Sequence, residues 1–158
     1  MKDTFLMVVR ASTPRRYFAI ATLLVLGGFL IFIALAQPSS SLGVQVFLLA
    51  SGGVGLWLAE RLRRATLLHL ELTLDELRWS NGEVLARVDE IVSVDRGVFA
   101  YKPSNGFVLR LSGRGPLRWE PGMWWRTGRR LGVGGVASAP QAKAMAEMIS
   151  AMIAEREK

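Results

Sequence analysis

The stretch Tyr17–Ala59 reads YFAIATLLVLGGFLIFIALA-QPSSS-LGVQVFLLASGGVGLWLA and contains no Asp, Glu, Lys, Arg or His. Its polar residues 37–41 separate an apolar segment of 20 residues (17–36) from a second of 18 residues (42–59). A helix rises about 1.5 Å per residue and the hydrocarbon core of a bilayer is about 30 Å thick, so each segment is long enough to cross. The stretch therefore predicts a transmembrane hairpin of two helices.

Basic residues flank the two apolar segments, whereas the turn between them is uncharged. The juxtamembrane arginines are Arg15 and Arg16 before the first segment and Arg61, Arg63 and Arg64 after the second. Because positive charge is retained on the cytoplasmic side of a membrane, we expect both termini to be cytoplasmic. The expected location is a bacterial inner (plasma) membrane.

An alternative is export, since Ala34-Leu35-Ala36 resembles a signal-peptidase site and Arg15-Arg16 forms part of a twin-arginine pattern. Against it, the apolar region is about twice the usual length of a signal peptide, and a second apolar segment follows at once.

Small residues cluster in both apolar segments, and such residues let two helix backbones approach closely. They are Gly27 and Gly28 in the first and Ser51, Gly52 and Gly55 in the second. The hairpin packing against itself accounts for them, and a groove for a partner's transmembrane helix is the alternative. The absence of an ionisable group at mid-membrane argues against a transporter or channel.

The composition excludes several kinds of site. There is no cysteine, so disulfides, thiolate metal sites and cysteine catalysis are ruled out, and the single histidine, His69, rules out a multi-histidine metal centre. Neither a cofactor nor a metal is expected.

After the apolar stretch the pattern changes to short strands. Leu68–Leu72 alternates apolar and polar residues, and two further runs flank Asn81-Gly82, a strong signal for a tight hairpin turn. Further strands are expected over Ile91–Tyr101, Phe107–Ser112, Leu117–Trp119 and Leu131–Val136, with an irregular stretch from Glu120 to Arg130.

The chain ends in a predicted helix over residues 139–155. Ser138 and Gln141 have the spacing of a capping box, and apolar residues recur at helical spacing from Met145 to Ile153. The expected organisation is a cytoplasmic N-terminal segment (1–16), which forms an interfacial helix or a frayed end, then the hairpin (17–59), then a cytoplasmic domain (66–158).

The segments Leu72–Trp79 (LTLDELRW) and Val88–Val94 (VDEIVSV) resemble bacterial membrane proteins in which two transmembrane helices precede a small pleckstrin-homology (PH)-like domain. The resemblance implies an antiparallel β barrel or sandwich of six or seven strands with a C-terminal amphipathic helix. The fold class expected is therefore a membrane hairpin plus a small α+β domain. The resemblance also implies a domain without catalytic residues.

The segment Trp119–Arg130 (WEPGMWWRTGRR) is unusual in its Trp and Arg content. Tryptophan favours the bilayer interface and arginine pairs with phosphate, so contact with a membrane or a partner is expected. The contact residues expected are Trp119, Trp124, Trp125, Arg126, Arg129 and Arg130. The alternative is that the tryptophans fill the domain and the arginines are solvated or pair with Asp89, Glu90 and Asp95.

No pattern points to an enzyme. Gly132–Gly135 lacks the Lys-Ser/Thr of a phosphate loop, and His69 has no acid or nucleophile that the sequence places beside it. We expect a non-catalytic accessory protein that assembles, stabilises or positions a larger membrane complex, with a membrane-protein partner or a second copy of the chain. The alternatives are a module that binds anionic phospholipid and, third, an enzyme with an unrecognised site; a nucleic-acid partner is not expected.

Overall fold

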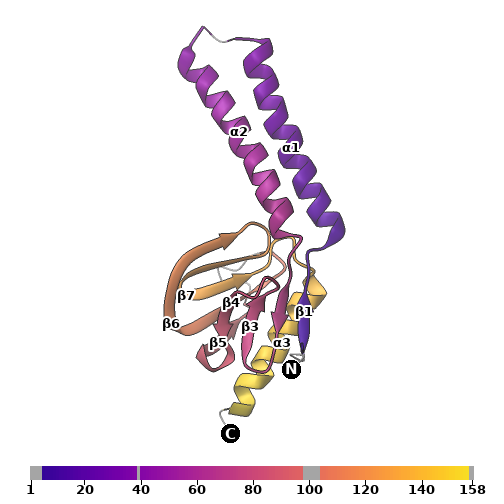
Figure 1. Cartoon of the computed structure of the whole chain (residues 1–158), viewed down its shortest axis with the longest axis vertical. Coiled ribbons are helices and arrows are strands. Elements are labelled where there is room, and N and C mark those ends of the chain that lie inside the picture. The colour runs from indigo at the N-terminus through magenta and orange to yellow at the C-terminus, as the bar shows by residue number, and fades with distance from the viewer. Residues whose placement is uncertain (1–4, 39, 98–103, 157–158) are drawn as a thin grey trace. The chain divides into compact units, whose positions relative to one another are not determined.

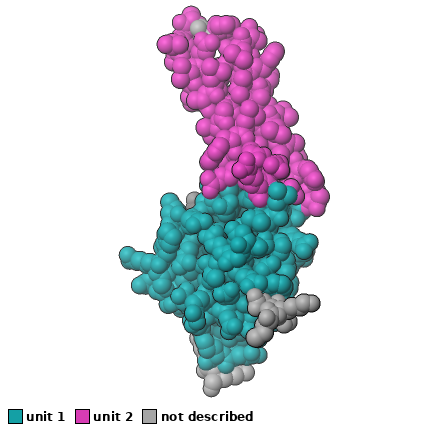
Figure 2. Space-filling model, in the orientation of Figure 1, with its two compact units in different colours: residues 1–12, 65–158 teal, residues 13–64 magenta. Residues whose placement is uncertain are grey.

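A computed structural model describes residues 5–38, 40–97 and 104–156. The chain divides into two compact units: residues 13–64, and residues 1–12 together with 65–158 (Figure 2). We refer to the first as the hairpin and to the second as the β domain.

The hairpin consists of α1 (Thr13–Ala36) and α2 (Leu42–Ala65), of 24 residues each (Figure 1). Both helices are long and apolar enough to cross a membrane, by length and composition alone. They extend past the charge-free stretch at both ends, since α1 begins at Thr13 and α2 ends at Ala65. Pro14 lies in the first turn of α1, where a missing N–H costs nothing. Of the expected turn 37–41, Ser39 lies outside the described residues.

The β domain contains two antiparallel sheets and one long helix. The first sheet has the order β1 (Met7–Val9), β2 (Leu70–Leu72), β3 (Glu76–Trp79) and β4 (Val84–Arg87). The second has the order β5 (Ile91–Asp95), β6 (Phe107–Glu120) and β7 (Trp124–Val133), and α3 (Ala139–Arg156) ends the chain. The 3-10 turn η1 (Val88–Glu90) joins β4 to β5.

The N-terminal segment is neither an interfacial helix nor a frayed end, so that expectation is wrong for its described part. Met7 pairs with Leu72 and Val9 with Leu70, and the Val9 side chain is fully buried. The backbone of Arg10, the residue after β1, is held by two hydrogen bonds. Its N–H donates to Gln141 Oε1 (2.9 Å), and its carbonyl accepts from the Ser138 N–H (2.9 Å). Gln141 therefore bonds to the N-terminal segment rather than closing a capping box.

The expectation of an irregular stretch over residues 120–130 is also wrong, because most of these residues belong to β7. The expected strand 117–119 is the end of a single long β6, which turns at Gly122 (φ +76°) into β7. The pairing of β6 with β7 shifts register between Arg110 and Gly115 and again before Arg118, and both strands curve (Figure 1). Bulges of this kind bend a strand without ending it. The expected strand 91–101 ends earlier, at Asp95, and its residues 98–101 lie outside the described residues.

Helix α3 supplies one side of the core. Met145, Ile149 and Ile153 are buried against residues of both sheets, as their helical spacing predicts. At the end of α3 the Arg156 guanidinium donates to the carbonyls of Val88, Asp89 and Ile91 (2.9–3.0 Å). The C-terminal end of the helix is thereby attached to the link between the two sheets.

Candidate functional site

Trp124 belongs to the core of the β domain and not to a contact surface, so this part of the expectation is wrong. Its side chain is 2% exposed and lies edge-to-face on Trp79 of β3, with ring centroids 6.1 Å apart. The physical reason is strand alternation: side chains point to opposite faces at successive positions, so Trp124 points inward and Trp125 does not. The aromatic pair joins the first sheet to the second.

Trp125 and Arg126 are half-buried and serve mainly the fold. The Trp125 ring covers Gly132 so closely that a Cβ at that position would collide with it. Arg126 lies over Gly115, and its Nη1 donates to the carbonyl of Leu85 (2.6 Å). Arg126 therefore connects β7 to β4 of the other sheet.

Two pairs of arginines lie directly across from each other on β6 and β7, and their surroundings differ. Arg118 is the cross-strand partner of Arg126, and Arg110 is the partner of Arg130. In the first pair Arg118 forms an ion pair with Glu83 (3.0 Å) and Arg126 bonds to the Leu85 carbonyl. This first pair is therefore compensated by β4 and the turn before it.

The second pair has no such compensation among the described residues. Arg110 and Arg130 are exposed, and so is Arg129. Gly128, which precedes the two consecutive arginines, has a φ of +56°, a conformation that marks a bulge. The three arginines help to line an open groove of about 350 Å³, which we call the arginine groove. Its lining residues are Val92, Arg110, Leu111, Ser112, Arg129 and Arg130.

The acids that the sequence offered as partners for these arginines are engaged elsewhere or lie apart from the groove. Asp89 is bonded to Arg87 (3.2 Å), and this hydrogen bond raises the pKa of Arg87 above its ordinary value. An Asp95 oxygen accepts the backbone N–H of Gly97 (3.1 Å). Glu90 lies in η1 and does not line the groove.

A second exposed feature lies where the β6–β7 hairpin bends. Leu117 is 77% exposed and Trp119 is 47% exposed, although both are large and apolar. The two residues lie two positions apart near the end of β6, and we call this exposed apolar pair the Leu117–Trp119 patch. Leu117, Arg110 and Ser112 were not expected from the sequence, because nothing local distinguishes them from ordinary strand residues.

The juxtamembrane arginines lie at the start of α1 and at the end of α2, away from the turn that joins the two helices. Arg15 and Arg16 lie in the first turn of α1, while Arg61, Arg63 and Arg64 lie in the last turns of α2. The Arg16 guanidinium lies 5.5 Å from the Tyr17 ring and that of Arg61 5.5 Å from the Trp57 ring. Pairs of this kind are typical of the level where a membrane helix meets headgroups.

Three of the five small residues form the crossing of α1 and α2. A Cβ at Gly27 would lie 2.9 Å from the Gly52 carbonyl oxygen, and one at Gly55 would lie 3.2 Å from Gly27 Cα. Gly28 faces away, because a Cβ there would meet no atom within 4 Å. Ser51 is half-buried. Gly28 therefore takes no part in packing α1 against α2, a role that its place in the cluster of small residues had predicted.

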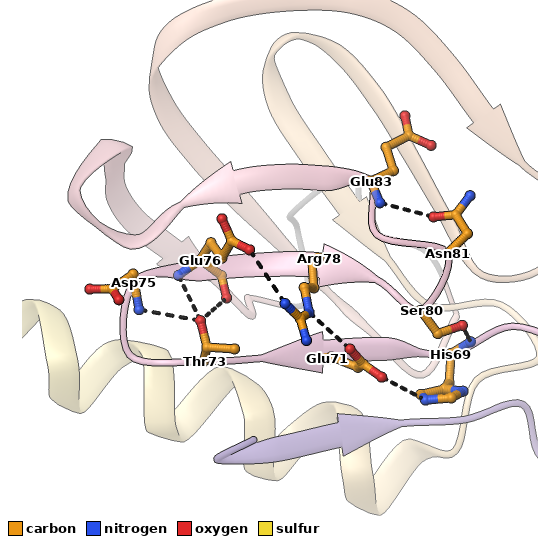
Figure 3. A network of polar contacts seen from close by, with 9 residues as sticks. All are labelled: His69, Glu71, Thr73, Asp75, Glu76, Arg78, Ser80, Asn81 and Glu83. Carbon is orange, nitrogen blue, oxygen red and sulfur yellow. Dashed lines mark hydrogen bonds and ion pairs between the residues drawn. The ribbon is translucent and has the colours of Figure 1, made fainter. Parts of the chain in front are cut away.

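His69 belongs to a closed polar network on the first sheet (Figure 3). Its Nε2 lies 3.0 Å from one carboxylate oxygen of Glu71, and the other oxygen accepts a hydrogen bond from Arg78 Nε (3.0 Å). The neighbouring turn is organised by Thr73, whose Oγ1 accepts from the backbone N–H groups of Asp75 and Glu76 (3.3 and 3.1 Å). Among the described residues no cluster of three or more His, Cys, Asp or Glu is placed to hold a metal ion.

Comparison with protein-family models, with curated proteins and with solved structures gives no match for this chain.

Proposed function

We propose that this chain is a non-catalytic accessory protein of a bacterial inner membrane, which assembles, stabilises or positions a larger membrane complex. The hairpin anchors it, both termini are cytoplasmic, and a PH-like β domain supplies the docking surface. Three features of the molecule support this role: the surface of the hairpin, the layout of the β domain and the Leu117–Trp119 patch.

The surface of the hairpin supports the membrane anchor. Apolar side chains along both helices are exposed, among them Phe18 (76%), Leu42 (75%) and Phe47 (68%). Burying one such side chain is worth about 1.5–3 kcal/mol, so leaving this many in water would be strongly unfavourable. The backbone polar groups of a helix are satisfied internally, as a hydrocarbon environment requires.

The layout of the β domain supports the PH-like assignment. A sheet of four antiparallel strands, a sheet of three, and one C-terminal helix packed on both is the layout that this kind of domain implies, although here β1 precedes the hairpin. The contacts of Trp79 with Trp124 and of Arg126 with Leu85 join the two sheets. The side chains of His69, Glu71 and Arg78 bond to one another, with Glu71 between the other two.

The single observation that carries the docking role is the Leu117–Trp119 patch. Protein interfaces are centred on buried apolar anchors, with Trp and Arg enriched among the residues that matter most. Arg114 and Arg118 lie beside the patch in sequence and are exposed. A partner that covers Leu117 and Trp119 would remove two large apolar side chains from water.

The test is co-purification of the full chain from native membranes in mild detergent, with a C-terminal tag and identification by mass spectrometry. One stoichiometric membrane complex is expected, and it should be lost from the variant with Leu117→Ala and Trp119→Ala. The matched control is Leu74→Ala, since Leu74 is 67% exposed but lies in the turn between β2 and β3. Migration of the wild-type protein alone in native gels would contradict the proposal.

A further inference from the structure

We infer that the arginine groove is a binding site for a phosphate group. The inference concerns the outer face of the β5–β6–β7 sheet, whereas the accessory role rests on the Leu117–Trp119 patch. Each can fail without the other.

The uncompensated arginine pair is the first feature that points to an anion. Like charges placed directly across from each other on neighbouring strands destabilise a sheet. The Arg118–Arg126 pair shows how this domain offsets that cost, through Glu83 and the Leu85 carbonyl. Around Arg110 and Arg130 the groove is lined by a third arginine and by no acid, so an anion from outside the chain is the missing counter-charge.

The chemistry of the groove favours phosphate among anions. The planar guanidinium group binds phosphate through two parallel N–H···O bonds, and three arginines from β6 and β7 line this groove. Ser112 adds a hydroxyl that can donate to a further phosphate oxygen. A carboxylate ligand would satisfy one arginine, whereas a phosphate offers enough acceptor oxygens for three.

The size of the groove and its apolar side indicate what kind of molecule carries the phosphate. Its volume of about 350 Å³ is larger than a lone phosphate needs and lies near the lower end of the range for small-molecule pockets, roughly 300–1,000 Å³. Val92 supplies an apolar wall and is 51% exposed. The groove therefore suits a phosphate ester whose organic part lies against Val92, either a lipid headgroup or a soluble phosphate compound.

The experiment uses the full chain and two probes that share this chemistry. Glycerol 3-phosphate is titrated calorimetrically into the protein held in phosphatidylcholine nanodiscs. Phosphatidylglycerol is added to the protein in neutral detergent, and bound lipid is counted by native mass spectrometry. Each is repeated with the double variant Arg110→Gln, Arg130→Gln and with the control Arg114→Gln, which removes the same kind of exposed charge from β6 outside the groove.

The double variant is expected to bind about tenfold more weakly or worse, because each charge-assisted hydrogen bond that is lost costs about that factor. The control should stay within about twofold of wild type, as removal of a distant exposed charge does little. The double variant should unfold at no lower temperature than wild type, since a like-charge pair has been removed. This readout separates lost binding from lost folding.

The two probes identify the source of the phosphate. Binding of both that depends on Arg110 and Arg130 indicates a lipid headgroup, and binding of glycerol 3-phosphate alone indicates a soluble ester. The inference is overturned if neither probe binds, or if Arg114→Gln weakens binding as much as the double variant does.

Discussion

Substitution of Gly27 by alanine is expected to loosen the hairpin, whereas the same substitution at Gly28 is not. The two glycines are adjacent on α1, so the change in intrinsic helix propensity is the same for both, about 1 kcal/mol in favour of alanine in water. They differ in what the new methyl group meets. At Gly27 it would lie 2.9 Å from the Gly52 carbonyl oxygen and 3.2 Å from Leu56 N, and at Gly28 nothing lies within 4 Å.

The magnitude follows from that difference. Ordinary contact distances for a methyl group begin near 3.4 Å, so α1 and α2 must separate by several tenths of an ångström to accept a methyl group at the Gly27 position. Overpacking of this kind costs about 1–3 kcal/mol. Because the propensity term cancels, the difference in stability between Gly27→Ala and Gly28→Ala should itself be about 1–3 kcal/mol.

The assay is a titration of the full chain in mixed micelles with sodium dodecyl sulfate. Helix separation is followed by energy transfer between dyes on Thr13→Cys and Arg64→Cys, which are the only thiols because the chain has no cysteine of its own. Gly27→Ala should lower the detergent midpoint relative to Gly28→Ala. Equal midpoints for the two variants would refute the crossing at Gly27.

Four further substitutions test the β domain. Trp124→Ala should lower the free energy of unfolding by about 3–5 kcal/mol and Trp119→Ala by less than about 1 kcal/mol, because only Trp124 is a core side chain. Urea unfolding followed by near-UV circular dichroism measures both values. Equal losses would contradict the burial of Trp124. Glu71→Gln should lower the free energy of unfolding by about 1–3 kcal/mol in the same assay, because it weakens the charged hydrogen bond with Arg78 and the Glu71 side chain is only 12% exposed. An unchanged free energy of unfolding would mean that water already solvates the network. Gly132→Ala should destabilise the domain and displace the Trp125 ring, seen as a shift in tryptophan emission, and an unchanged spectrum would contradict that contact.

The hairpin and α3 could be predicted from the sequence because their signals are local. A long stretch without charge specifies two membrane-length helices whatever the rest of the chain does. The recurrence from Met145 to Ile153 likewise specifies which face of α3 is buried. Neither inference needs a partner segment to be known.

The missed elements depend on partners distant in the chain. β1 is three residues long and exists through its pairing with β2, about sixty residues later. In β6, Gly113, Gly115 and Pro116 are local turn signals, but pairing with β7 turns them into a bend within one strand.

The candidate site was predicted only in part for the same reason. Composition drew attention to the Trp/Arg-rich segment, but composition does not distinguish the buried Trp124 from its neighbour Trp125. That distinction needs the strand and its register. The opposition of Arg110 and Arg130 also needs the register, since twenty residues separate them in sequence. Three of the six expected contact residues are exposed: Trp119, Arg129 and Arg130.

The central claim, a membrane hairpin that carries the β domain on the cytoplasmic side, is tested most directly by labelling of single cysteines. Because the native chain has no cysteine, Ser40→Cys in the turn and Arg114→Cys in the β domain each create a unique thiol. We expect a membrane-impermeant maleimide added to intact spheroplasts to label the first and to spare the second until the membrane is opened. Labelling of both positions in intact spheroplasts, or extraction of the protein by alkaline carbonate, would contradict the claim.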